Sequence, residues 1–128
     1  MSTVEKDYKF AASHEWVKNN NDGTVTIGIS DHAQGLLGDV VFVELPEEGD
    51  EITAGEQFTL VESVKAASDV YAPISGEIIA INEELEDSPE SINESAFVEG
   101  WIVKVKLSNP EQLDSLLSYD AYNADIED

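Results

Sequence analysis

The sequence predicts a mainly β fold with short helices and a C-terminal helix. Residues 24–29 show strand alternation after an Asn-Asp-Gly turn, and residues 40–45 form an apolar run that Pro46 ends. Leucines on one helical face lie near the C-terminus. With 41% hydrophobic residues, residues 1–128 should form a single domain whose core spans about residues 8–107.

Two short helices are predicted from capping signals within the β-rich part of the chain. Ser30 or Asp31 can cap a helix that ends before Gly38, which can adopt the left-handed conformation found after helix ends. Ser88 followed by Pro89 favours a second helix, because serine caps well and proline fits the first turn. We expect both helices to be brief.

The longest helix should begin at residues 108–110 and run past Leu117. A Ser-Asn-Pro sequence gives its capping signal, and three leucines supply its apolar stripe. We therefore expect a C-terminal helical segment at about residues 109–126, loosely packed beyond Asp120.

The charge of the chain limits its partners. Six lysines and no arginine stand against 28 acidic residues, which gives a formal net charge of -22. Nucleic acid and anionic membranes would be repelled, so we expect a soluble monomer whose partners carry basic docking surfaces. An acidic proteome or a salty habitat explains the total charge equally well.

Cysteine is absent, so the fold contains no disulfide and no thiolate. The first ten residues lack the apolar core of a signal peptide and the arginine-rich pattern of a transit peptide. No apolar run approaches the roughly 20 residues that cross a bilayer. We expect a cytoplasmic protein.

Lys65 is the most informative residue of the sequence. It is the only lysine between Lys18 and Lys104, in a chain without arginine. Strand-forming runs at residues 57–61 and 69–72 converge on it, which predicts a hairpin that presents a lysine at its tip. The alternative is an ordinary solvated surface lysine.

An internal similarity flanks this lysine. Residues 38–43 resemble residues 76–81, and the two segments lie on opposite sides of Lys65 in the sequence. An approximate two-fold arrangement of equivalent strands would produce this pattern. Chance similarity between short β-strands remains an alternative, because β-branched runs follow turn glycines in many sheets.

The surroundings of Lys65 resemble lipoyl and biotinyl carrier modules, with Gly49 placed 16 residues before the lysine and Gly76 placed 11 residues after it. Longer motifs resemble the family of glycine cleavage system H proteins from about residue 8 to about residue 117. These motifs are His14-Glu15-Trp16, Gly28-Ile29-Ser30-Asp31-His32-Ala33-Gln34, Leu37-Gly38-Asp39-Val40-Val41-Phe42-Val43, Glu62-Ser63-Val64-Lys65-Ala66 and Gly100-Trp101. The resemblance implies a flattened β-sandwich, or barrel-sandwich hybrid of the lipoyl-domain type.

The same resemblance implies lipoate attached covalently to Lys65. Biotin is disfavoured, because biotin carriers usually place methionine on both sides of the lysine, where this chain has Val64 and Ala66. A non-catalytic carrier is implied, with four partners. They are a pyridoxal-phosphate glycine decarboxylase, a tetrahydrofolate-dependent aminomethyltransferase, an FAD-containing dihydrolipoyl dehydrogenase and the lipoylating enzyme. The alternatives are a lipoyl carrier or relay of another pathway and an acidic interaction domain whose Lys65 is never modified.

Four further residues are candidates for roles around the arm. Glu62 and Asp69 flank the hairpin, where the lipoylating enzyme could recognise them. The alternative is that they are solvated carboxylates at strand ends. Glu15, with Ser13 and Asp69, could hold the protonated amine of a loaded arm in a sheltered groove. The alternative for Glu15 is an exposed position beside a buried Trp16.

No catalytic residue and no metal site is predicted. His14 and His32 lack zinc-ligand spacing, and no serine has a nucleophile-elbow context. Asp31 and His32 fit capping and packing roles at a helix start. Trp16 and Trp101 are assigned to the core, where large aromatic side chains bury much area.

Overall fold

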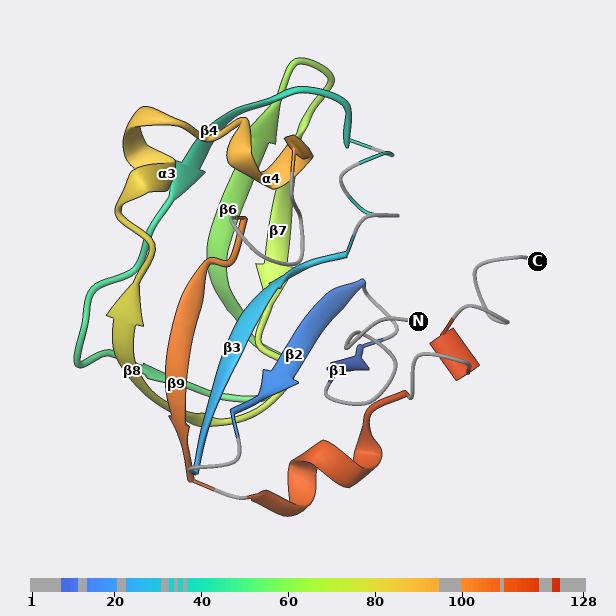
Figure 1. The fold of residues 1–128 in the computed structure, drawn as a ribbon, viewed down its shortest axis with the longest axis vertical. Coiled ribbons are helices and arrows are strands. Elements are labelled where there is room, and N and C mark those ends of the chain that lie inside the picture. Colours follow the sequence, from blue (N-terminus) through green and yellow to red (C-terminus); the bar gives the residue numbers. More distant parts are fainter. Residues whose placement is uncertain are drawn as a thin grey trace.

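The computed structural model describes residues 8–11, 14–20, 23–30, 33, 35, 37–94, 100–108, 110–117 and 121–122. Two antiparallel sheets form the molecule (Figure 1). The six-stranded sheet has the order β1-β2-β3-β9-β8-β5. Its strands are β1 (Tyr8–Phe10), β2 (Glu15–Asn19), β3 (Thr24–Ile29), β9 (Val103–Leu107), β8 (Gly76–Ile81) and β5 (Glu51–Ile52).

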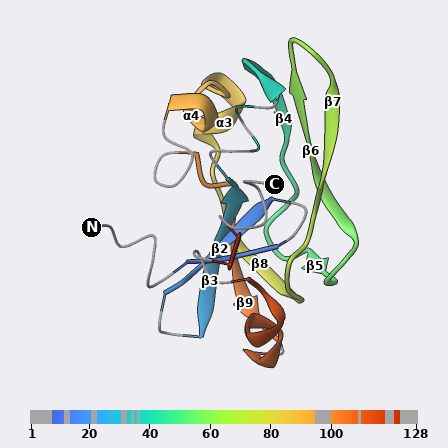
Figure 2. The same ribbon diagram turned by 90° about the vertical axis from the view of Figure 1, so that its right-hand side faces the viewer.

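The second sheet has three strands in the order β4-β6-β7. They are β4 (Val40–Glu44), β6 (Gln57–Ser63) and β7 (Ala67–Tyr71). This sheet forms one side of the molecule, at the right in Figure 2, and most strands of the six-stranded sheet lie to its left. The predicted mainly β, two-layer fold is therefore confirmed.

The main core lies between the two sheets. Val25 and Ile27 of β3 and Val43 and Val61 of the smaller sheet are almost fully buried in the same hydrophobic cluster. Such burial of aliphatic side chains is the main favourable term in folding. It replaces the disulfides that the composition excludes.

A second hydrophobic cluster is mainly aromatic and contains Trp16. The indole of Trp16 requires a glycine opposite it. Trp16 pairs with Gly28 across β2 and β3, and a Cβ at Gly28 would lie 2.6 Å from Trp16 Cζ2. Trp16 is fully buried, as predicted, whereas Trp101 is partly buried against the same cluster. The glycine of this strand thus makes room for the largest side chain of the core.

The internal similarity has a structural counterpart. The register of β4 shifts between Val40 and Phe42, and that of β8 shifts between Ile78 and Ala80. These irregularities occupy equivalent positions of the two similar segments, and both intervening residues, Val41 and Ile79, are exposed. A bulge leaves one residue unpaired and bends its strand. The two segments lie in different sheets.

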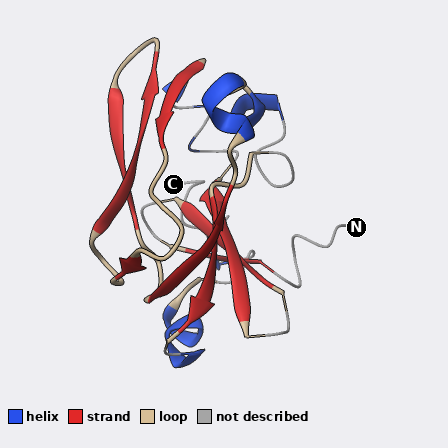
Figure 3. Cartoon of the chain, turned by 90° about the vertical axis from the view of Figure 1, so that its left-hand side faces the viewer, coloured by secondary structure: helices blue, strands red, loops and turns tan. Residues whose placement is uncertain are grey.

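The short helices lie at both ends of the sandwich. Helices α3 (Glu84–Asp87) and α4 (Ser91–Glu94) lie near the end that carries the β6–β7 turn, and the 3₁₀ helix η1 (Pro110–Ser115) lies at the opposite end (Figure 3). The helix predicted at Ser88 begins at Ser91, and α3 was not predicted. No helix among the described residues is long and apolar enough to cross a membrane.

The predicted helix before Gly38 is present in part, since Ala33, Gly35 and Leu37 are helical. The backbone N–H of Ala33 donates to Ser30 Oγ at 3.1 Å, which is the predicted cap. Gly38 has φ +80, the left-handed conformation expected after the helix end. Asp31 and His32 lie outside the described residues.

The prediction of a long C-terminal helix through Leu117 is wrong. The element is a 3₁₀ helix that ends at Ser115. Leu117 instead pairs with Phe10, and each residue donates its N–H to the other's carbonyl at 2.8 Å. This bridge requires extended backbone, so the helix cannot continue through Leu117. Most of the segment beyond residue 117 lies outside the described residues.

Candidate functional site

Lys65 lies at the tip of the β6–β7 hairpin, which projects at one end of the molecule (Figure 1). The hydroxyl of Ser63 holds this tip. It donates to the carbonyl of Ala66 at 3.1 Å and accepts from the N–H groups of Lys65 and Ala66, each at 3.2 Å. One donor and two acceptors use the full capacity of a hydroxyl. The predicted hairpin is confirmed, but the role of Ser63 was missed, although serine is a common turn residue.

The tip rests against the residues just before β4. The N–H of Val64 donates to the carbonyl of Asp39 at 3.0 Å. A Cβ added to Gly38 would lie 3.3 Å from Cε and 3.6 Å from Cδ of Lys65. The stem of the exposed lysine therefore lies over Gly38, whose missing side chain leaves room for it.

A small cavity of about 110 Å³ lies along the edge of the sandwich beside β7. Pockets for whole small molecules are usually about 300–1,000 Å³, so this cavity suits only the end of a longer group. Its lining includes Leu37, the residue next to Gly38, and three consecutive residues of β7. The cavity is lined by His14, Ile29, Ala33, Leu37, Val61, Ser68, Asp69 and Val70.

The predicted arm-sheltering residues differ from one another in their exposure to solvent. Asp69 is exposed and lines the cavity, and its Oδ1 accepts from Gln57 Nε2 at 3.0 Å. Glu15 is buried, with 2% of its surface exposed, and its Oε2 accepts from the N–H of Tyr71 at 2.9 Å. The alternative of an exposed Glu15 is therefore wrong. Ser13 lies outside the described residues.

His14 is the site residue that the sequence did not reveal. It has φ +81, a left-handed conformation that non-glycine residues rarely adopt, and it lines the cavity. Its Nδ1 lies 2.7 Å from Tyr122 Oη, which also lies 2.6 Å from Ser30 Oγ. The ring of Tyr122 stacks on Phe10 with a centroid distance of 4.4 Å. A partner 108 residues away gave no local signal.

Metal binding finds no support in the described part of the chain, because it contains no group of three potential His, Asp or Glu ligands.

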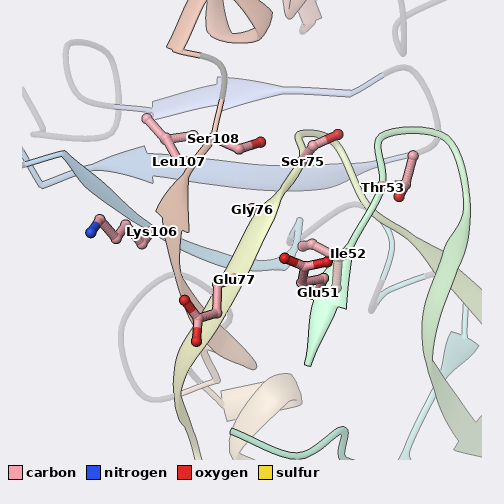
Figure 4. Close-up of a pocket in the computed structure, with 9 residues that line it drawn as sticks. All are labelled: Glu51, Ile52, Thr53, Ser75, Gly76, Glu77, Lys106, Leu107 and Ser108. Carbon is pink, nitrogen blue, oxygen red and sulfur yellow. The ribbon is translucent and has the colours of Figure 1, made fainter. Parts of the chain in front are cut away.

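A wider depression of about 420 Å³ lies where β5, β8 and β9 meet, and Figure 4 shows its lining. Glu77 there pairs across the sheet with Glu51 on one side and Lys106 on the other. None of its lining residues belongs to the β6–β7 hairpin, so it is separate from the Lys65 site.

The comparisons with known proteins cover nearly the whole chain. The family model described as Glycine cleavage H-protein matches residues 8–128. The chain belongs to this family. It is similar to the glycine cleavage system H protein of Aliivibrio fischeri strain MJ11, with 66% identity over 93% of this chain and 94% of that protein. The H protein of Vibrio parahaemolyticus is 63% identical over 98% of this chain and 99% of the relative.

A solved structure supports the same assignment. The crystal structure of a glycine cleavage system H protein from Mycobacterium marinum matches with a TM-score of 0.87 and 36% identity, over 94% of this chain and 97% of that one. The family resemblance inferred from the motifs is therefore confirmed, and the chain has a role in the glycine cleavage system.

Proposed function

We propose that this family member is the lipoyl-bearing carrier of the glycine cleavage system and that Lys65 is its attachment residue. The observation that carries the proposal is the exposed amine at a hairpin tip held by Ser63. The small side chains of Ala66 and Ala67 let an enzyme approach the backbone of the tip closely. Among the described lysines, Lys65 is the one that lies in a turn rather than in a strand.

The attachment step needs an activated carboxyl group from outside the chain. The neutral Lys65 amine attacks the carbonyl carbon of a lipoyl adenylate and an N–C bond forms. The C–O bond to AMP breaks, AMP leaves with the electron pair of that bond, and the nitrogen gives up one proton to solvent. The amine loses its positive charge, so the formal net charge of -22 becomes one unit more negative. The described residues near Lys65 present the amine at the hairpin tip, and the enzyme activates the carboxyl group of lipoate.

The residues around Lys65 fit a long flexible arm. The lysine stem lies over Gly38, next to Leu37, which lines the cavity. Apolar Ile29 and Val61 in the cavity wall suit hydrocarbon, and the exposed carboxylate of Asp69 suits an ammonium group. When attached, lipoate supplies a dithiol that carries and releases groups, which is chemistry that a chain without cysteine lacks.

We propose that the carrier transports the aminomethyl group of glycine from one partner enzyme to the next. It makes or breaks no bond without these enzymes. The arm would be loaded by the pyridoxal-phosphate decarboxylase, unloaded by the tetrahydrofolate-dependent aminomethyltransferase and reoxidised by the FAD-containing dihydrolipoyl dehydrogenase. Tethering raises the effective concentration of the intermediate at each docked enzyme. We place this cycle in the cytoplasm and expect a monomeric carrier.

We propose a sheltering role for Glu15, Asp69 and Ser13 toward the loaded arm. Asp69 lines the cavity, and Glu15 adjoins His14, which also lines it. A carboxylate shielded from water attracts an ammonium group more strongly than an exposed one does. Glu15 also accepts from the N–H of Tyr71, so it fixes the strand that forms the cavity edge.

Glycine-dependent exchange of bicarbonate, with purified decarboxylase added, tests the proposed function. We expect exchange with the lipoylated wild-type protein and none with Lys65→Arg, which keeps the charge but cannot be lipoylated. Exchange supported equally by Lys65→Arg would contradict the proposal. A lipoylated wild-type protein that supports no exchange would instead favour a lipoyl carrier or relay of another pathway.

A further inference from the structure

The outer face of the three-stranded sheet carries a regular pattern of side chains. Strand register aligns them in two rows, one of which adjoins the hairpin tip, because Glu62 and Ala67 form the last pair before the turn. We define the outer face by these two rows. The row beside the tip contains Phe42, Glu62 and Ala67. The next row contains Glu44, Leu60 and Asp69. Figure 2 shows this sheet at one side of the molecule, with the six-stranded sheet on its other side.

Apolar side chains on this face are left in solvent. Phe42 is 47% exposed. Ala67, at the other end of the same row, is also exposed, and Leu60, in the next row on the neighbouring strand, is partly buried. The bulge of β4 adds Val41, and Val64 at the tip is 66% exposed. Scattered exposed apolar residues are ordinary, but neighbouring ones around polar residues mark interaction sites.

The charges on the face select the kind of partner. Three of its six residues, Glu44, Glu62 and Asp69, are carboxylates that alternate with the apolar positions. The strands β4, β6 and β7 contain no lysine, and the other described lysines lie on β1, β2 and β9 of the larger sheet. The complementary surface is an apolar patch surrounded by arginine or lysine side chains.

We propose that the outer face is the docking surface for the enzyme that acylates Lys65, which would present such a basic-rimmed apolar patch. This inference rests on the proposed function. An unmodified lysine reaches only the length of its own side chain, so the acylating enzyme must contact the hairpin itself. Enzymes that act later can reach the group at the end of a longer arm. The row that adjoins the tip is therefore covered when the Lys65 amide forms.

Steady-state acylation by a purified lipoate–protein ligase, with lipoate and ATP, tests the inference on the full chain. Phe42→Ala should raise the KM for the carrier about tenfold with kcat nearly unchanged, as expected for a central apolar contact. Ile79→Ala is the matched control, because Ile79 is 43% exposed at the equivalent bulge of the other sheet. It should leave both constants unchanged.

A second pair of variants tests the charges without removing apolar area. The double variant Glu44→Gln with Glu62→Gln should raise KM and weaken its dependence on salt. The matched double variant Glu51→Gln with Glu77→Gln removes two exposed carboxylates from the larger sheet and should leave that dependence unchanged.

Equal KM values for Phe42→Ala and Ile79→Ala would overturn the inference, provided that wild-type Lys65 is acylated. A wild-type protein that is never acylated at Lys65 would instead overturn the proposed function and this inference with it. Sedimentation gives a further test. A dimer of the wild type that Phe42→Ala dissociates would assign the face to a second copy of the chain, and the docking inference would fail.

Discussion

At the scale of single residues, the site depends on small side chains more than on reactive ones. Gly38 leaves room for the stem of Lys65, Gly28 leaves room for Trp16, and Ser63 closes the turn. Glycine has no reactive side chain, and the hydroxyl of Ser63 is engaged in three hydrogen bonds. The two glycines determine where a larger group can lie, and the serine fixes the turn that carries the proposed attachment residue.

Gly28→Ala should destabilise the fold, because its Cβ would overlap the buried indole of Trp16. We expect a loss of about 1–3 kcal/mol in the free energy of unfolding, measured by urea titration. Gly35→Ala is the control: a Cβ there meets no atom within 4 Å, so stability should stay the same or rise. Equal losses in the two variants would contradict the assigned contact.

Ser63→Ala should loosen the hairpin tip without unfolding the sheet. The N–H groups of Lys65 and Ala66 lose their shared acceptor, so their hydrogen exchange should accelerate. NMR-detected exchange measures this, with Ser68→Ala in the adjacent strand as the control. Unchanged protection at both amides would show that Ser63 does not hold the tip.

At the scale of elements, contacts between segments far apart in the sequence position the residues around the cavity. Glu15 of β2 accepts from the N–H of Tyr71 in β7, although 56 residues separate them. His14 is held by Tyr122, from the other end of the chain. The first contact joins the edge strand β7 of the small sheet to the larger sheet, and the second joins the residue before β2 to the C-terminal part of the chain.

Two substitutions separate the structural role of Glu15 from its proposed role toward the arm. Glu15→Ala leaves the partly buried N–H of Tyr71 without this acceptor and should cost about 1 kcal/mol in stability. Glu15→Gln keeps an acceptor oxygen but removes the formal charge, so it should cost less. If the charge shelters the loaded arm, Glu15→Gln should still shorten the lifetime of the aminomethylated protein. A lifetime equal to that of the wild type in both variants would refute the sheltering role.

The sequence predicted the elements whose signals are local. The hairpin, the Ser30 cap and the left-handed Gly38 each depend on a few neighbouring residues, and all three are present. The C-terminal helix was predicted wrongly, because its leucine spacing could not show that Leu117 pairs with Phe10. For the same reason no local pattern indicated the positive φ of His14 or its contact with Tyr122.

At the scale of the whole molecule, charge and topology act together. The net charge of -22 attracts basic partners to the entire surface, whereas the outer face beside Lys65 combines that charge with exposed apolar area. The depression of about 420 Å³ lies at β5, β8 and β9, and none of its lining residues belongs to the hairpin that carries Lys65. The molecule thus presents Lys65, the proposed attachment residue, and its proposed docking surface on the same sheet.

Encounters with partner enzymes should depend strongly on ionic strength. Because exposed charges are screened over about 8 Å at physiological salt, the association rate with the decarboxylase should fall as salt increases. Stopped-flow measurements over a salt series test this, with sucrose as a control for viscosity. A rate that does not change with salt would argue that the acidic surface plays no part in steering.

The identity of the group on Lys65 tests the central claim most directly. Intact-mass analysis of the protein, purified from its native host, should show the increment of a single lipoyl group, and peptide mapping should place it on Lys65. The same increment should be absent from Lys65→Arg. A wild-type chain with the bare sequence mass, or with the group on another lysine, would contradict the account.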